Sequence, residues 1–381
     1  MSGRKKRQST ILAEGGRRKE WRGRIVNVPV ERASTILFDD VRHLDASGPR
    51  LGEYRYGLQG TATHWALSEA LTELEPGAAG TALYSSGLAA VTAALQSVLS
   101  AGDELLVTDS IYGPTRKFCD TVLRRFGVKT HYYDPLIGAE IARLFSEKTR
   151  AILLESPGSL TMEVQDVPAI CAIARERGIA TVLDNTWATP LFFPAIAAGV
   201  DISVLAATKY VGGHADLLLG AATATEAYFS NLQRMSWDMG HAVSADDAWL
   251  GSRGLRTMGV RLKQHEASAL KIANWLKQQP QVGKVLHPAL PDCPGHELWK
   301  RDFKGSSGLF SFELHGDTRT FADRLELFGI GYSWGGYESL VLPVRPQRTV
   351  SKAPAGNLVR LHIGLEDADD LIEDIALALP K

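Results

Sequence analysis

The chain has 381 residues, of which 45% are hydrophobic and 22% are charged, a composition typical of globular rather than disordered or fibrous proteins. Its net charge of −1 gives no overall attraction to nucleic acid or to an anionic membrane. No apolar run approaches the roughly 20 residues of a transmembrane helix, and no apolar segment follows the basic N-terminus as in a secretory signal. A chain of this length usually forms more than one core, so we expect two main domains.

The first 24 residues carry nine lysines and arginines but only two acidic residues, Glu14 and Glu20. We expect a frayed, solvated tail there; the alternative is an arm that binds an anion or a partner. Residues 27–60 contain Pro, Gly and Tyr without clear periodicity, which is typical either of an extended arm on a neighbouring subunit or of an ordinary loop. We therefore assign residues 1–60 to an N-terminal arm with a basic tail.

Strand-like and helix-like segments alternate between residues 63 and 177. Apolar residues at helical spacing predict the helices, and short apolar β-rich runs predict the strands. Strands separated by helices indicate βαβ units and a mostly parallel sheet. The expected helices are 63–75, 88–99, 114–126, 139–145 and 167–177, and the expected strands are 81–84, 104–108, 128–132 and 151–154.

A turn of small residues, Ser85, Ser86 and Gly87, lies between the strand at 81–84 and the helix at 88–99. Such a turn can bind an anion, because free backbone N–H groups and the helix dipole converge there. A tight turn without a ligand explains the residues equally well, since no complete phosphate-binding glycine motif is present. The residues alone leave both interpretations open.

Two short β-branched runs in the middle of the chain each lead to polar residues. Residues 180–183 are followed by Asp184, and residues 202–205 lead to Thr208 and Lys209. Parallel strands are buried on both faces and bind ligands beyond their carboxyl ends. A lysine there can form a Schiff base with a carbonyl cofactor, and a carboxylate can keep a pyridinium nitrogen protonated. The pair leaves two readings open, a pyridoxal phosphate site and ordinary turn residues.

The alternation of strand-like and helix-like segments becomes less regular after Lys209. A helix over 245–276 is expected to lead to a second domain that mixes strands and helices. We expect a large α/β domain over 61–255, which would bind the cofactor, and an α+β domain over 256–381. The later strands are expected at 309–314, 331–334, 340–342 and 358–363, with helices beyond Thr318 and Asp367.

A different function, that of a serine hydrolase, is suggested by a G-x-S-x-G match around Ser333, with His362 following. The nucleophile of that motif is followed directly by a helix. Here a β-like run follows instead, and too few residues separate Ser333 from His362 for the intervening units of that fold. We regard this as the poorer interpretation.

Nine blocks of the sequence, in one order and spacing, resemble one enzyme family, the cystathionine β-lyase branch of the pyridoxal-phosphate-dependent cysteine/methionine metabolism (trans-sulfuration) enzymes. The resemblance covers residues 26–379 and implies fold type I of the PLP-dependent transferases, as in aspartate aminotransferase. The blocks are 32–39, 134–141, 154–170 (LESPGSLTMEVQDVPAI), 183–190 (LDNTWATP), 206–214 (AATKYVGGH), 252–262, 305–312, 332–340 (YSWGGYESL) and 360–367 (RLHIGLED).

The resemblance implies which residues would contact pyridoxal 5'-phosphate. Lys209 would bind it as a Schiff base, Asp184 would pair with the pyridine nitrogen, and Tyr112 would stack over the ring. Backbone N–H groups and one hydroxyl would hold the phosphate. These phosphate ligands would be Ser86, Gly87, Leu88 and Thr208.

The resemblance also implies a substrate site. Arg360 would bind the α-carboxylate as a bidentate fork, with Ser333 and Trp334 nearby. A guanidinium in an apolar strand does suit an anion, although an exposed edge-strand arginine is the simpler reading of the residue alone. Lys209, Tyr112 and Tyr56 would be catalytic, and Tyr56 would come from a neighbouring subunit to contact cofactor and substrate as well. The active unit would then be at least a dimer, and the family is usually tetrameric.

The implied reaction is β-cleavage of L-cystathionine to homocysteine, pyruvate and ammonia in methionine biosynthesis, with L-cysteine and related S-substituted cysteines as further substrates. The alternative within the family is γ-elimination or γ-replacement, as in methionine γ-lyase or cystathionine γ-synthase; the blocks 154–170 and 332–340 favour β-cleavage. Relatives commonly carry arginines where Leu58 and Gln59 stand and an acidic residue near Lys117, so the chemistry is better supported than the substrate.

We expect a cytoplasmic enzyme without a metal, without nucleic-acid or membrane partners, and acting on a small sulfur amino acid. Its three cysteines, Cys119, Cys171 and Cys293, have no metal-like spacing. Free thiols of this kind fit a reducing compartment.

Overall fold

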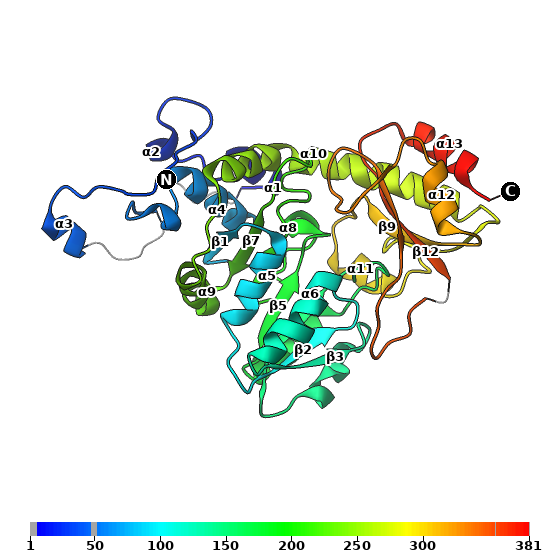
Figure 1. The fold of residues 1–381 in the computed structure, drawn as a ribbon, viewed down its shortest axis with the longest axis horizontal. Helices are drawn as coiled ribbons and strands as arrows, with labels where there is room; N and C mark the ends of the chain where they lie inside the picture. The colour runs from blue at the N-terminus through cyan, green and yellow to red at the C-terminus, as the bar shows by residue number, and fades with distance from the viewer. Residues whose placement is uncertain (1–5, 47–51, 355, 381) are drawn as a thin grey trace.

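The computed structural model describes residues 6–46, 52–354 and 356–380, and two β-sheets organise it (Figure 1). The larger sheet has seven strands in the order β1-β7-β6-β5-β4-β2-β3. Strands β2 to β6 run parallel to their neighbours among themselves, whereas β7 is antiparallel to both β1 and β6. Its strands are β1 (Gly80–Tyr84), β2 (Glu104–Thr108), β3 (Lys129–Tyr133), β4 (Thr149–Glu155), β5 (Ala180–Asp184), β6 (Ile202–Leu205) and β7 (Gly220–Ala224).

Helices cover this sheet, which confirms the expected α/β fold class with a mostly parallel sheet. Most of them connect consecutive strands, as βαβ units require. They are α4 (Ala62–Leu74), α5 (Gly87–Gln96), α6 (Gly113–Phe118) with the π-helix Cys119–Leu123, the 3₁₀ helix Gly138–Leu144, α7 (Val167–Glu176), α8 (Thr189–Phe192) and α9 (Glu226–Asp238).

The smaller sheet has five strands in the order β10-β11-β12-β9-β8. The long helix α10 (Ala245–Leu276) runs from the larger sheet to this one, along the top of the view in Figure 1. Within the described residues, no helix is both long enough and apolar enough to cross a membrane. The elements that follow α10 are β8 (Val282–Leu286), α11 (His296–Asp302), β9 (Leu309–Leu314), α12 (Thr318–Arg324), β10 (Gly329–Ile330), β11 (Leu340–Val344), β12 (Asn357–His362) and α13 (Ala368–Ala378). The short helices α2 (Lys19–Arg22) and α3 (Val41–Ala46) and the 3₁₀ helix Gly57–Gln59 precede α4.

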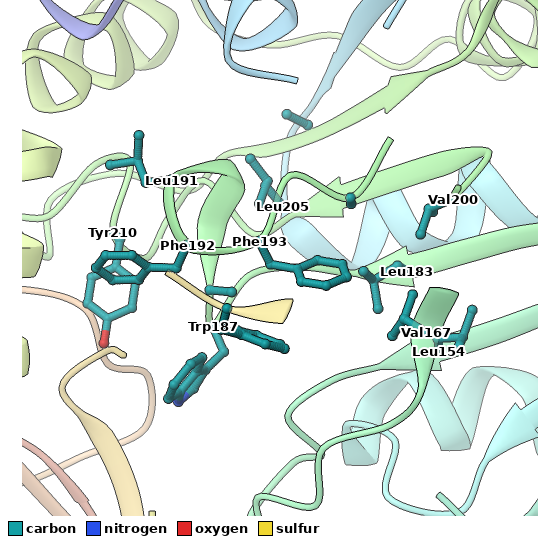
Figure 2. Close-up of a cluster of buried hydrophobic side chains, with 14 of the residues drawn as sticks. Leu154, Val167, Leu183, Trp187, Leu191, Phe192, Phe193, Val200, Leu205 and Tyr210 are labelled. Carbon is teal, nitrogen blue, oxygen red and sulfur yellow. The ribbon is translucent and has the colours of Figure 1, made fainter. Parts of the chain in front are cut away.

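The central strands are buried on both faces because their alternate side chains enter two different cores. Val182 and Val204 pack into one apolar cluster, whereas Leu183 and Leu205 pack into the other. Figure 2 shows part of the second cluster, in which Leu183 and Leu205 lie near Phe193. A continuous β-branched and apolar run is what a parallel strand covered on both sides needs. The same packing fixes where each strand ends, and therefore where its last polar residue emerges.

The expected solvated tail is wrong for the described part of the basic N-terminus. Residues Gln8–Glu14 form helix α1, which packs against α4 and α10 and buries Leu12 to 4% exposure. Arg256 of α10 donates hydrogen bonds to the carbonyl oxygens of Leu12 (2.8 Å) and Gly15 (3.0 Å). Charge counting missed the helix because its main contacts come from buried Leu12, from backbone carbonyls that accept from Arg256, and from Gln8, which donates to the Pro190 carbonyl oxygen at 2.9 Å.

Two further differences arise where the chain has special local constraints. The expected strand at 331–334 is wrong: Ser333 and Gly335 have φ values of 83° and 87°, and this left-handed backbone is incompatible with an extended strand. Strand β7 was missed because its sequence, GAATA, lacks β-branched and aromatic residues apart from one threonine. A Cβ atom on Gly220 would lie 2.0 Å from the Ser86 carbonyl oxygen, so contact with the start of α5 requires small residues there.

We expect Leu12→Ala to lower the free energy of unfolding by about 2 kcal/mol, the lower range for removing a buried leucine side chain. Denaturant titration of the full chain measures the change. Thr10→Ala, on the exposed side of the same helix, is the matched control and is expected to change stability little. Equal effects of the two substitutions would contradict the packing of α1.

Candidate active site

Asp184 and Lys209 meet at one edge of the larger sheet. Strands β5 and β6 are parallel neighbours, so Asp184 at the end of β5 lies beside the turn after β6 that carries Lys209. Thr186 donates its backbone N–H (3.1 Å) and its hydroxyl (2.5 Å) to Asp184 Oδ1. Burial raises the pKa of Asp184, and the Thr186 hydrogen bonds and the positive charge of Lys209 oppose that rise. A cationic partner would therefore stabilise the ionised carboxylate further.

The ammonium group of Lys209 loses its proton at an unusually low pH for a lysine. Burial is the main cause, and with the nearby charge of Arg360 it lowers the pKa of Lys209 to about 8, although Asp184 acts in the opposite direction. The Nζ atom donates a hydrogen bond to Ser333 Oγ at 2.5 Å and lies 5.3 Å from the centre of the Trp334 ring. An amine with this pKa is partly neutral near physiological pH, which suits a nucleophile or a general base.

Arg360 lies on β12 and approaches the site from the smaller sheet. Its Nη2 atom donates to the Ser333 carbonyl oxygen at 2.9 Å, so Ser333 contacts both Lys209 and Arg360. Burial lowers the pKa of Arg360 to about 10. No described acidic side chain forms an ion pair with Arg360. A buried guanidinium without a carboxylate partner can bind an anionic ligand with its planar fork.

Tyr112 and Glu155 stand on the other side of Asp184. The Tyr112 backbone N–H donates to Glu155 Oε2 at 2.7 Å, and Glu155 is the direct neighbour of Asp184 in the pairing of β4 with β5. Burial and then the negative charges of Glu155 and Asp184 raise the pKa of Tyr112. Burial and Asp184 likewise raise the pKa of Glu155 well above its usual range. Sequence reasoning gave Glu155 no role, although its position at a strand end was the available signal.

The start of α5 forms a tight cradle beside the Lys209 turn. Ser86 caps the helix, since its hydroxyl accepts from the Ala89 N–H at 3.2 Å. A Cβ atom on Gly87 would lie 2.4 Å from the Cβ of Ala206, three residues before Lys209. The first N–H groups of a helix, here those of Gly87 and Leu88, have no acceptor within the helix. Together with the helix dipole they favour an anion such as a phosphate.

Two predicted site residues are placed less directly. The Thr208 hydroxyl donates to the Leu219 carbonyl oxygen (3.1 Å) and accepts from the Leu219 N–H (2.9 Å), so a phosphate contact would require it to turn. Tyr56 is 52% exposed, and its backbone forms a bridge with Thr35. No hydrogen bond or ring contact joins Tyr56 to Lys209 within the described residues of one chain. The roles of Thr208 and Tyr56, like those of the other predicted site residues, stay predictions.

The serine hydrolase interpretation fails on geometry. His362 Nε2 accepts the Gly335 N–H at 3.0 Å and forms no hydrogen bond with Ser333, whose hydroxyl accepts from Lys209 instead. The residues after Ser333 form bends that lead into strand β11 rather than into a helix. A nucleophile elbow needs both the serine–histidine contact and that helix.

The residues gathered here fit pyridoxal phosphate. A partly neutral buried lysine suits its aldehyde, a carboxylate suits a protonated ring nitrogen, and the glycine-lined start of α5 suits a phosphate. The chain brings five predicted residues together: Lys209, Asp184, Ser333, Trp334 and Arg360. Tyr112 lies close enough to Asp184 and Arg360 for their charges to shift the pKa of its hydroxyl.

Known proteins are similar to this chain over nearly its whole length. A sequence model of the Cys/Met metabolism PLP-dependent enzyme family matches residues 9–380. The cystathionine beta-lyase MetC of Escherichia coli is 45% identical, covering 97% of both chains, and the cystathionine beta-lyase of Haemophilus influenzae is 44% identical, covering 96% of both. The solved structure of the methionine gamma lyase CalE6 from Micromonospora echinospora superposes with a TM-score of 0.89 at 32% identity, covering 100% of both chains.

We expect the amine of Lys209 in the cofactor-free protein to be labelled by an acylating reagent with a midpoint near pH 8, because only the neutral amine reacts. An unstructured lysine peptide, with a pKa of about 10.4, is the reference, and peptide mass spectrometry measures the labelling. Arg360→Gln removes a positive neighbour and should move the midpoint upward. Labelling of Lys209 that follows the reference peptide would contradict the lowered pKa.

Proposed function

The chain belongs to the Cys/Met metabolism PLP-dependent enzyme family, and on that premise we propose that it is a PLP-dependent carbon–sulfur β-lyase. Its proposed reaction cleaves L-cystathionine with water to homocysteine, pyruvate and ammonia, and L-cysteine and related S-substituted cysteines are further candidate substrates. The observation that carries the proposal is the position of Lys209, whose amine lies close enough to Asp184 and to Arg360 for both charges to shift its pKa. The family is PLP-dependent, so pyridoxal phosphate is the cofactor.

The proposed cofactor ligands follow from the site geometry. Lys209 would bind the cofactor covalently, Asp184 would hold the ring nitrogen, and the N–H groups at the start of α5 would hold the phosphate. When bound, pyridoxal phosphate withdraws electrons from the substrate's Cα and so stabilises negative charge there. Tyr112 would cover the ring, and the bond from its N–H to Glu155 holds its backbone in place. These assignments rest on proximity and on the chemistry of each group.

The substrate would be oriented by charge. Its α-carboxylate fits the fork of Arg360, which Ser333 holds through its carbonyl oxygen. Once the substrate's amine has replaced it on the cofactor, the freed Lys209 amine would take the proton from Cα, since its pKa of about 8 lets it accept and return protons near neutral pH. The same amine, or a tyrosine hydroxyl, donates a proton to the sulfur that leaves Cβ. Hydrolysis of the remaining three-carbon fragment gives pyruvate and ammonia.

Cleavage at Cγ is the alternative within the family. The comparison favours β-cleavage, because the two β-lyase relatives are 45% and 44% identical whereas the methionine gamma lyase is 32% identical. Lys209, Asp184 and Arg360 would serve both reactions, so the shared chemistry at Cα does not separate them.

A homo-oligomer with shared active sites is part of the proposal. The arm before α4 carries exposed apolar side chains, including Leu37 at 88%, Val41 at 70% and Val26 at 66%, and apolar surface of this kind is typical of an interface. The arm extends away from the body of the chain on the left of Figure 1. We infer that it lies on a neighbouring subunit and delivers Tyr56 there, in a tetramer built from dimers. A cytoplasmic location, without nucleic-acid or membrane partners, completes the proposal.

We expect the holoenzyme to release pyruvate and homocysteine from L-cystathionine and to release sulfide and pyruvate from L-cysteine. L-Methionine, which offers no β-sulfur, should be a poor substrate. Chromatographic product analysis with all three substrates tests this, and 2-oxobutyrate as the main product would establish γ-cleavage instead. Lys209→Ala should lower the rate of pyruvate formation by at least about 100- to 10,000-fold, the usual contribution of a general base.

Shared active sites predict complementation between two inactive variants. Lys209→Ala and Tyr56→Ala subunits, refolded together, would form mixed dimers in which one site has both native residues. Random pairing gives about a quarter of the wild-type activity, because half the dimers are mixed and one of their two sites is complete. Tyr56 acting within its own chain would leave the mixture as inactive as the separate variants.

A further inference from the structure

A second buried carboxylate, outside the site described above, lies where β2 ends. Asp109 is fully buried and accepts hydrogen bonds from three consecutive backbone N–H groups, those of Thr349 (2.8 and 2.9 Å), Val350 (2.8 Å) and Ser351 (2.8 Å). It also accepts from Ser351 Oγ (2.9 Å) and Arg116 Nη2 (2.7 Å). Successive N–H groups that converge on one carboxylate form an anion nest.

The donors come from the segment that connects β11 to β12 in the smaller sheet, and we call residues 348–351 the latch segment. Arg348 adds a second attachment: its Nη1 atom donates to the Asp109 carbonyl oxygen at 2.5 Å, and its Nη2 atom donates to Glu163 Oε1 at 3.0 Å and to Thr161. The latch segment therefore joins the connection between two strands of the smaller sheet to the edge of the larger sheet.

Hydrogen bonds rather than apolar packing hold the latch segment in place. Val350 is 55% exposed, and the Thr349 and Lys352 side chains are also exposed. Burial alone would raise the pKa of Asp109, but the hydrogen bonds from Ser351, Arg116 and the neighbouring N–H groups lower it to about 2. The carboxylate is therefore ionised at neutral pH, and its bonds are charge-assisted.

Each end of this connection leads directly to the active site. Asp109 precedes Tyr112 by three residues, and Tyr112 is the N-cap residue of α6. The latch segment follows β11, and Leu342 of β11 is paired with Arg360 of β12. Asp109 thus connects the segment that leads to Tyr112, the residue proposed to cover the cofactor, with the strand pair that carries Arg360.

We propose that Asp109 is a positioning residue for substrate binding, which holds the latch segment so that Arg360 stays at a fixed distance from Tyr112. This inference rests on the proposed role of Arg360 as the carboxylate ligand. Without the charge on Asp109, the β11–β12 connection loses its main attachment and Arg360 is held less precisely. We expect the chemistry at Cα to be unaffected, because Thr186 holds Asp184 and the Lys209 backbone N–H donates to the Ala206 carbonyl oxygen (2.9 Å) within the turn after β6.

Asp109→Asn in the full-length holoenzyme tests the proposal, since it removes the charge at nearly constant volume. We expect KM for the sulfur amino acid to rise roughly tenfold with kcat within about twofold, the pattern for lost binding that is common to ground and transition states. The affinity for L-alanine, read from the absorbance of the bound cofactor without turnover, should fall by the same factor. L-Alaninamide lacks the carboxylate, and its affinity should not change.

Further variants separate positioning from a general loss of structure. Ser351→Ala removes one side-chain bond to Asp109 and should give a smaller change of the same kind. Asp317→Asn, at the exposed start of α12, is the control and should leave all these values unchanged. Trypsin should cleave after the exposed Lys352 faster in Asp109→Asn than in the control.

The affinities for L-alanine and L-alaninamide, together with KM, decide whether Asp109 positions Arg360. Weaker binding of L-alanine but not of L-alaninamide supports the proposal. Equal weakening of both ligands, or unchanged KM in both Asp109→Asn and Ser351→Ala, overturns it. The ligand titrations need a bound cofactor but no cleavage of cystathionine, so an error in the proposed substrate would leave this test intact, whereas a protein that binds no cofactor would refute the proposed function itself.

Discussion

The site depends on one constraint, the meeting of ionisable groups at the edge of a sheet that is buried on both faces. Strands β4, β5 and β6 are parallel neighbours, so the side chains at their ends emerge together. Glu155 and Asp184 are adjacent there, and Lys209 arrives from the next turn. Burial opposes ionisation of all three, raising the pKa of both carboxyl groups and lowering that of the lysine. The fold thus supplies a partly neutral lysine beside acids that a cationic ligand would favour in their ionised form.

The smaller sheet completes the site through a strained residue. Ser333 adopts a left-handed backbone conformation that is uncommon for serine, and it accepts from Lys209 with its hydroxyl and from Arg360 with its carbonyl oxygen. Such strain persists only where surrounding contacts compensate for it, and these two bonds do so. Because one donor follows the larger sheet and the other lies on the smaller sheet, Ser333 fixes the relation between the two groups.

The sequence predicted what local patterns encode. The strand ends at Asp184 and before Lys209 follow from β-branched runs, and the helix Ala245–Leu276 follows from apolar periodicity; both agree with the structure. Strand β7 was missed because packing against α5, rather than β-propensity, selects its small residues. The bonds between Asp109 and residues 349–351 join positions about 240 apart in the chain, and no local pattern can show such a pairing. Glu155 had a local signal, its position at a strand end, but its burial comes from the tertiary fold.

Near the site, charged side chains as well as apolar contacts join the two sheets, and the charged contacts restrict how one sheet can shift against the other. Apolar packing is non-directional and tolerates small shifts of one layer against another, whereas a carboxylate that accepts from three consecutive N–H groups permits only one register. Asp109 and the ion pair of Arg348 with Glu163 therefore specify position as well as attachment. Buried ions of this kind add little net stability, because desolvation offsets their attraction. Their presence beside a site that must align a carboxylate fork with a cofactor ring is consistent with a role in geometry.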